Sequence, residues 1–178
     1  MSEKTSALMN STPVTKRVPR IFKIALTGGP CAGKTSLLNK FVREAVAIPN
    51  LKVILAPEAA TALKHSGINF VDAGSDSTFQ ELIDKQQLSS EDAAYIVAIK
   101  YAAANKDATV IIICDRGIMD GEAYFDNPAD FATILRRFAL TTELVYDRYD
   151  AVICLRSAAV GAPEFYTTSD GTPRDESV

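Results

Sequence analysis

The sequence of 178 residues has no excess of basic residues and few cysteines. Its formal net charge is −3, and no face carries a dense row of Lys and Arg, so we do not expect nucleic acid as a partner. Its three cysteines are an odd number without metal-ligand spacing, which argues against a disulfide framework: Cys31, Cys114 and Cys154. They fit a reducing compartment.

The sequence also lacks any apolar run long enough to span a bilayer, and its first residues lack the apolar core of a secretory signal. We therefore expect a cytoplasmic protein without a transmembrane segment. Residues 1–19 are rich in Ser, Thr, Lys and Arg and contain two prolines, which favours a disordered N-terminal tail over a transit peptide. The length and the apolar fraction of 47% suit one folded domain, which we place at residues 20–157.

The most informative stretch lies at the start of that domain and matches the pattern G-x-x-x-x-G-K-[ST]: Gly28, Gly29, Pro30, Cys31, Ala32, Gly33, Lys34 and Thr35. Its glycines let backbone N–H groups converge on phosphate oxygens, and a following helix presents its positive end to them. We expect Lys34 to reach the terminal phosphates. The Thr35 hydroxyl suits a Mg²⁺ shared with those phosphates, and Ser36 adds a second hydroxyl.

The flanks of this stretch supply the strand–loop–helix context that a phosphate-binding loop requires. Residues 21–27 are apolar and β-branched without a breaker, which predicts a strand. After the loop, the apolar residues fall on one face of a helix: Leu37, Leu38, Phe41, Val42 and Ala45. A Gly-rich turn that matches by chance is therefore the weaker interpretation.

Further strands are predicted at residues 51–56, 108–114 and 151–155, and helical segments lie between them. Ser77 with Gln80 forms a predicted capping box for a long helix, and whether that helix breaks near Ser89-Ser90 stays open. The helix is predicted from residues that recur mostly three or four positions apart: Phe79, Leu82, Ile83, Gln86, Ala93, Val97, Tyr101 and Ala104. Strands that alternate with helices predict a three-layer α/β domain with a mostly parallel sheet.

Three charged residues follow predicted strands, at the edge where open α/β sheets bind ligands. Asp115 is interpreted as a Walker-B-like carboxylate that orients Mg²⁺, although an Asp beside Gly117 also makes a reasonable turn. Arg116 either pairs with a phosphate near the transferred group or holds Asp115 and the fold. Glu58 is placed to accept a proton from an attacking hydroxyl, or it is a glutamate satisfied by a helix N-terminus.

Three stretches together resemble P-loop proteins of the nucleoside- and nucleotide-kinase type. They are residues 28–36, the run Pro57-Glu58-Ala59-Ala60-Thr61, and the run Ile113-Cys114-Asp115-Arg116-Gly117 with Asp120, Ala123 and Tyr124. The thymidylate-kinase group has a similar Asp-Arg stretch followed at the same spacing by Ala-Tyr. Over about residues 20–175 the closest resemblance is to an ATPase-like domain shared by nicotinamide-riboside-kinase-like proteins and the eukaryotic TRPL-translocation-defect family.

The resemblance implies the sheet order 2-3-1-4 of P-loop kinases, a lid after the fourth strand, and binding of ATP or GTP with Mg²⁺. It implies catalytic roles for Lys34, Glu58, Asp115 and Arg116, with Thr35 and Asp115 at the metal. Such proteins continue into a lid helix and a fifth strand. We therefore expect residues 158–178 to be the start of a truncated lid, with the fourth strand left as an unpaired edge that promotes self-association.

Two functions are compatible with these residues. The first is a Mg²⁺-dependent enzyme that binds a purine nucleoside triphosphate and either hydrolyses it or transfers its γ-phosphoryl group to a small molecule. The second, implied by the translocation-defect resemblance, is a non-catalytic GTP- or ATP-binding module that regulates protein trafficking or binds a phosphoinositide. No Asn-Lys-x-Asp motif follows a predicted strand, so the choice between ATP and GTP stays open.

Overall fold

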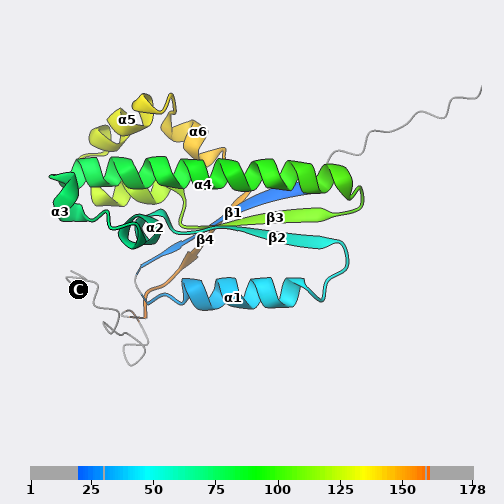
Figure 1. Cartoon of the computed structure of the whole chain (residues 1–178). Coiled ribbons are helices and arrows are strands. Elements are labelled where there is room, and N and C mark those ends of the chain that lie inside the picture. Colours follow the sequence, from blue (N-terminus) through cyan, green and yellow to red (C-terminus); the bar gives the residue numbers. More distant parts are fainter. Residues whose placement is uncertain (1–19, 30, 159, 161–178) are drawn as a thin grey trace, which may run out of the picture.

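The computed structural model of the chain describes residues 20–29, 31–158 and 160. Figure 1 shows a twisted sheet with helix α1 on one side and the long helix α4 on the other. In chain order the elements are β1 (Arg20–Gly28), α1 (Lys34–Ala45), β2 (Leu51–Ala56), α2 (Ala59–His65), α3 (Phe70–Ala73), α4 (Asp76–Ala104), β3 (Thr109–Asp115), the 3₁₀ helix η1 (Ile118–Tyr124), α5 (Pro128–Arg137), α6 (Thr142–Tyr146) and β4 (Ala151–Leu155).

The described sheet has four parallel strands in the order β2-β3-β1-β4. This confirms the predicted three-layer α/β fold and its strand order. Leu26 of β1 is level with Asp115 of β3 and with Ile153 of β4. The carboxyl ends of these strands therefore share one edge, where the Gly-rich loop and Asp115 emerge together.

Strand β3 is buried on both faces, as its unbroken apolar run predicts. Val110, Ile112 and Cys114 belong to the core cluster under α4, which also holds alanines of that helix. Ile113 packs on the opposite face with Leu26 and Leu38 of α1. Alternate residues of one strand thus supply both cores, which fixes the register of the sheet between its two helical layers.

Helix α4 runs unbroken through Ser89-Ser90. The predicted cap was wrong by two residues, because the Ser75 side chain, and not that of Ser77, accepts the hydrogen bond from the backbone N–H of Thr78. Ser75 occupies extended backbone, which is the conformation that an N-cap residue needs.

The apolar positions predicted for α4 are buried only in part, because Val97 is 52% exposed and Ala93 is exposed as well. Half-buried members of the set are Phe79, Leu82, Ile83 and Tyr101. The buried stripe follows the helical period but starts one residue later, and its members are Gln80, Asp84, Gln87, Glu91, Ala94, Ala98 and Ala102. The alanines let α4 lie close against the sheet. The polar members of the stripe lie over the edge where the strands end, and they become part of the candidate site.

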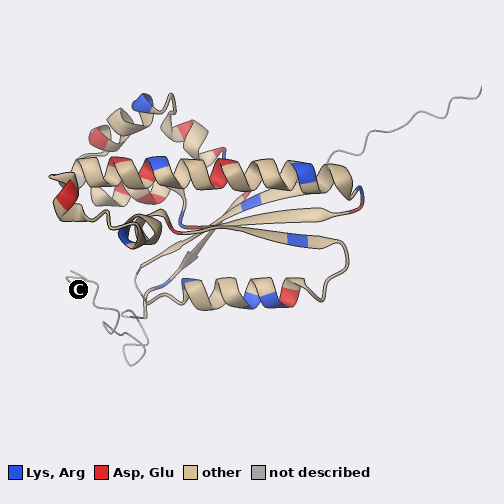
Figure 2. Ribbon diagram, in the orientation of Figure 1, with Lys and Arg blue, Asp and Glu red and all other residues tan. Residues whose placement is uncertain are grey.

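A smaller core cluster joins η1, α5 and α6 through Ile118, Phe131, Leu135 and Val145. In Figure 2 the Lys and Arg of the described residues are scattered over the helical layers and the strands, and they form no continuous stripe. Within the described ranges, no helix is long and apolar enough to cross a membrane. The predicted tail at 1–19 lies outside the described residues, as does nearly all of the predicted lid at 158–178.

Candidate functional site

The Gly-rich loop leaves β1 at Gly28 and enters α1 at Lys34. Gly28 has φ +136°, and a Cβ built on it would lie 2.2 Å from the carbonyl oxygen of Leu155 on β4, so only glycine fits here. Gly33, the N-cap of α1, has φ +79°. Cys31 also lies in the left-handed region, and Pro30 is outside the described residues. The sequence therefore supplies glycine where the turn needs it most.

The Lys34 side chain folds back across this loop, where its Nζ donates hydrogen bonds to the carbonyl oxygens of Gly28 at 2.7 Å and Gly29 at 2.9 Å. Burial lowers the pKa of Lys34, and the positive charge of Arg116 lowers it further. Asp115 and Glu58 act in the opposite direction. The ammonium group thus lies among the charged residues that the sequence singled out, while it donates its hydrogen bonds to neutral carbonyls of the loop.

The first turn of α1 is open to solvent and carries no acidic residue. Thr35 and Ser36 are exposed there, and the helix continues for 12 residues. Free backbone N–H groups and the helix dipole make such a turn attractive to anions. The loop and this turn together form the candidate phosphate site.

Asp115 is the last residue of β3, level with Leu26 at the end of β1. Its Oδ1 atom is buried and has no hydrogen-bond partner among the described residues. Burial raises the pKa of Asp115, and the negative charge of Glu58 raises it further, while Lys34 and Arg116 oppose the shift. A buried carboxylate oxygen without a partner costs free energy, and a cation at this edge would relieve that cost.

Arg116 and Glu58 form an ion pair across the site, with 2.7 Å between Arg116 Nε and Glu58 Oε1. Thr61 Oγ1 donates to the other carboxylate oxygen at 2.6 Å. Burial pushes the pKa of Glu58 upward, but these two hydrogen bonds and the charge of Arg116 outweigh it and lower the pKa overall. Glu58 is therefore ionised and oriented at neutral pH. It is the N-cap residue of α2, but its side chain makes no capping bond.

Asp120 completes the cluster, although its motif position was the only sign of it in the sequence. Its Oδ1 accepts a hydrogen bond of 2.7 Å from Thr27 Oγ1, and its Oδ2 lies 3.7 Å from an Arg116 nitrogen. Burial raises the pKa of Asp120. Oδ2 is a second buried carboxylate oxygen without a hydrogen bond among the described residues. The 3₁₀ helix η1 thus adds an acidic residue to the site. The rule that ligands bind at strand ends does not predict it, because Asp120 does not follow a strand directly.

The donor set fits Mg²⁺ bound together with a nucleotide. Mg²⁺ prefers oxygen ligands and usually keeps waters and substrate phosphates in its shell, so it needs only one or two protein groups. Asp115 offers an unpartnered carboxylate oxygen and Thr35 an exposed hydroxyl. In the part of the chain that the structure describes, no group of three or more His, Cys, Asp or Glu side chains could hold a metal ion unaided.

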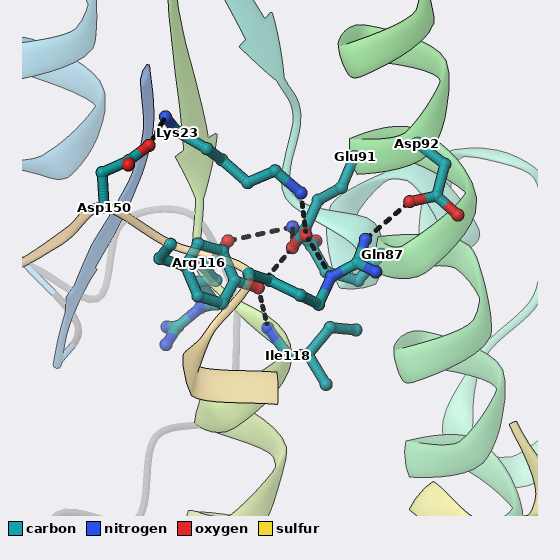
Figure 3. Close-up of polar contacts among 9 residues, drawn as sticks. Lys23, Gln87, Glu91, Asp92, Arg116, Ile118 and Asp150 are labelled. Atoms are coloured by element: carbon teal, nitrogen blue, oxygen red, sulfur yellow. Dashed lines mark hydrogen bonds and ion pairs between the residues drawn. The ribbon is translucent and has the colours of Figure 1, made fainter. Parts of the chain in front are cut away.

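A buried polar network behind the site holds the turn at Arg116, and Figure 3 shows it. Glu91 of α4 is fully buried, and its carboxylate accepts hydrogen bonds from Lys23, Gln87, Arg148 and Tyr149. We call these five residues the Glu91 network.

The Glu91 network connects to the site through two backbone contacts. Gln87 Nε2 donates to the carbonyl oxygen of Arg116 at 2.9 Å, and the N–H of Ile118 donates to Tyr149 Oη at 2.8 Å. Arg116 has φ +72°, which is unfavourable for a residue with a side chain. The network fixes the backbone on both sides of Gly117, so it stabilises the strained turn that aims Arg116 at Glu58.

A pocket opens beside the cluster, bounded by α2, α4, the turn at Arg116 and η1, and we call it the side pocket. Its charged members are Glu58, Asp84, Arg116 and Asp120. Ile83 and Tyr124 contribute apolar surface. Sequence reasoning missed Asp84, yet a signal was present: polar residues at 80, 84, 87 and 91 continue the period of the buried alanines.

The structure therefore brings Lys34, Glu58, Asp115 and Arg116 together at one edge of the sheet, next to the first turn of α1. A parallel sheet of order 2-3-1-4 with a Gly-rich loop between its first strand and first helix is the fold of a P-loop NTPase. Residues 23–178 match the family model of an AAA domain, and the chain belongs to that family. None of the curated proteins matches the chain.

Membership in this family gives the coarse function, which is nucleotide binding at the P-loop. P-loop domains of this kind generally bind their nucleotide with Mg²⁺.

Proposed function

We propose that the chain is a Mg²⁺-dependent phosphotransferase that moves the γ-phosphoryl group of ATP or GTP to a small acceptor in the side pocket. The observation that supports this most strongly is the shared position of Glu58 and Arg116. Both line the side pocket, and both are electrostatically coupled to Lys34 of the P-loop. A purely nucleotide-binding module has no need of an oriented carboxylate between a phosphate site and a second pocket.

The proposed roles follow from the local chemistry. The loop from Gly28 to Ser36 binds the phosphates through backbone N–H groups, and Lys34 exchanges its two loop carbonyls for the terminal phosphate oxygens. Thr35 and Asp115 would hold Mg²⁺, which would supply positive charge to the bound phosphates. Arg116 contributes positive charge near the transferred group.

In the transfer step, an acceptor hydroxyl oxygen attacks the γ-phosphorus and forms the new P–O bond. The bond from that phosphorus to the β–γ bridging oxygen breaks, and the nucleoside diphosphate leaves with the electron pair. Glu58 takes the hydroxyl proton, since its carboxylate is ionised and lines the side pocket. Water in place of the acceptor gives hydrolysis by the same roles.

Nucleotide titration tests the first part of the proposal. Lys34→Ala removes a charge-assisted contact worth about 1.5–3 kcal/mol, so ATP and GTP affinity should fall about tenfold to a hundredfold. Lys40→Ala is the matched control, because Lys40 lies on the same helix, is 60% exposed and pairs with Glu44 on the helix surface. Equal affinities for wild type and Lys34→Ala in calorimetric titrations would refute the phosphate site.

The roles of Asp115 and Glu58 are separated by a second pair of variants. Asp115→Asn should weaken Mg²⁺-dependent binding, while Glu58→Gln should leave binding nearly intact and lower turnover about a hundredfold. Turnover is measured as nucleoside diphosphate release. If both variants reduce binding equally, these roles are wrong. If wild type and Glu58→Gln turn over alike, Glu58 is not the proton acceptor. If wild type with candidate acceptors releases no nucleoside diphosphate, the regulatory-module alternative is favoured.

A further inference from the structure

The side pocket carries information about the acceptor, because one of its acids has no counterpart in the phosphate chemistry. Asp84 of α4 is 2% exposed and lines the pocket. Its Oδ1 accepts a hydrogen bond of 2.8 Å from Gln80 Nε2, and its Oδ2 has no hydrogen-bond partner in the described ranges. The proposed phosphoryl transfer assigns no role to Asp84. Asp84 is therefore an unexplained buried acceptor of hydrogen bonds.

The fold holds Asp84 in this position closely. A Cβ built on Gly121 of η1 would lie 2.7 Å from Asp84 Oδ1 and 3.0 Å from Gln80 Nε2, so the glycine makes room for the pair. Burial raises the pKa of Asp84, and the negative charge of Glu81 raises it further. An unpartnered buried carboxyl costs roughly 1–3 kcal/mol or more, and a hydrogen-bond donor on a bound molecule would recover that cost.

The charge of the pocket points the same way. Its described lining contains the carboxyl groups of Glu58, Asp84 and Asp120 and the single guanidinium of Arg116. Arg116 is already engaged by Glu58 at 2.7 Å and faces Asp120 at 3.7 Å. Lys34 and Asp115, which are electrostatically coupled to Glu58 and Arg116, have side chains of opposite charge. A bound nucleotide would make the surroundings still more negative, so a second anion would be repelled.

Resting on the phosphotransferase function proposed above, we propose that the side pocket selects an uncharged or cationic small alcohol that donates a hydrogen bond to Asp84. A phosphate-bearing acceptor, including a phosphoinositide headgroup, should bind less tightly, because the bound nucleotide and the ionised Glu58 carboxylate already make the surroundings negative. The acceptor hydroxyl faces Glu58, and the donor group lies at the Asp84 end, with Ile83 and Tyr124 against its apolar parts.

Matched pairs of probes test this charge selectivity, whatever the natural acceptor is. The pairs are adenosine and AMP, cytidine and CMP, and inositol and inositol 1-phosphate. Each member differs from its partner by one phosphate group. Binding to the full chain is measured by saturation-transfer NMR in the presence of Mg²⁺ and a non-hydrolysable nucleotide, and nucleoside diphosphate release is measured with Mg²⁺-ATP.

We expect an uncharged member to bind at least tenfold more tightly than its phosphorylated partner. Asp84→Asn should weaken that binding about tenfold and reduce the discrimination within the pair, with unchanged Mg²⁺-nucleotide affinity. Asp126→Asn removes the same charge at an exposed position outside the pocket and should behave as wild type. Preference for the phosphorylated member, or no effect of Asp84→Asn, would overturn the inference.

Binding of no pair to wild type would also overturn it, since the side pocket would then not be an acceptor site for these chemistries. In that case the phosphate site still stands if Lys34→Ala binds ATP and GTP more weakly than wild type does. Loss of the Lys34→Ala effect is a different failure, because it removes the phosphate site on which both proposals rest.

Discussion

The orphaned carboxyl of Asp84 predicts a specific dependence of stability on pH. Burial and the nearby Glu81 raise the pKa of Asp84 from 3.8 to about 7 in the folded chain. An acid whose pKa is raised by folding stabilises the fold fully below its unfolded pKa and loses that contribution as pH rises toward its folded pKa. Asp84 therefore penalises the wild-type fold increasingly between about pH 4 and pH 7.

The size of this penalty follows from the two pKa values. A rise from 3.8 to about 7 corresponds to about 4 kcal/mol at most, at 1.36 kcal/mol per pH unit. Part of it is already present at pH 5, because the unfolded carboxyl is ionised there. Between pH 5 and pH 8 the additional loss is about 2–3 kcal/mol.

Asp84→Asn removes this pH-dependent term while it keeps the shape of the side chain. Its amide oxygen can still accept the Gln80 hydrogen bond, which measures 2.8 Å in the wild type. We expect the variant to gain about 2–3 kcal/mol of unfolding free energy relative to wild type when the pH changes from 5 to 8. Urea denaturation of both proteins at pH 5, 6, 7 and 8 measures this difference directly.

The control for the pH effect is Asp126→Asn, since Asp126 is exposed. Its stability should follow that of wild type at every pH. Parallel pH profiles for wild type and Asp84→Asn would refute the reasoning, because they would mean that Asp84 is as well solvated or partnered in the folded chain as in the unfolded one. The pocket chemistry proposed for Asp84 would then lose its physical basis.

Two further predictions concern the scaffold of the site. Gly28→Ala should destabilise the fold by about 2–3 kcal/mol or more in urea denaturation, because its Cβ would meet the Leu155 carbonyl oxygen at 2.2 Å. The control Gly74→Ala, at φ +75° with nothing within 4 Å of the added Cβ, should cost only about 1 kcal/mol. Equal losses of unfolding free energy in the two variants would contradict the steric argument. Glu91→Gln leaves buried Lys23 without its carboxylate and should cost about 3–5 kcal/mol. Tyr149→Phe removes one hydroxyl and should cost about 1–3 kcal/mol, so a smaller loss for Glu91→Gln than for Tyr149→Phe would count against an electrostatic centre.

The fold was predictable because its determinants are local and repeat along the chain. An unbroken β-branched run predicts β3. The loop after β1 is predicted by glycines, and two of them, Gly28 and Gly33, lie where φ is positive. Parallel strands joined by helices then limit the topology strongly. The strand-end residues Glu58, Asp115 and Arg116 follow from the same rule, since the carboxyl ends of parallel strands meet at one edge.

The side pocket and the Glu91 network were not predictable in the same way, because they are formed by polar residues that occupy core positions. A pattern of hydrophobicity assigns Val97 to the buried face of α4, but Val97 is exposed. The face that is buried carries Asp84 and Glu91 instead. Burial of such residues depends on partners far away in the chain, such as Lys23, which lies 68 positions from Glu91. Neither propensity nor periodicity of apolar residues contains that information.

Residues of the buried stripe of α4 therefore have three structural roles on one helix face. Ala94, Ala98 and Ala102 set the distance between α4 and the sheet, Glu91 anchors the strained turn at Arg116 through Gln87, and Asp84 reaches the side pocket. Because these residues share one rigid helix, a shift of α4 toward or away from the sheet would move the turn at Arg116 and the floor of the pocket together. Occupation of the side pocket and the orientation of Arg116 are thus expected to be energetically coupled. Tyr149→Phe tests this coupling, because it removes the hydroxyl that holds the N–H of Ile118 next to the turn. The variant should bind the uncharged probes more weakly, although Tyr149 lies outside the pocket lining. Unchanged probe binding in Tyr149→Phe would show that the pocket and the turn act independently.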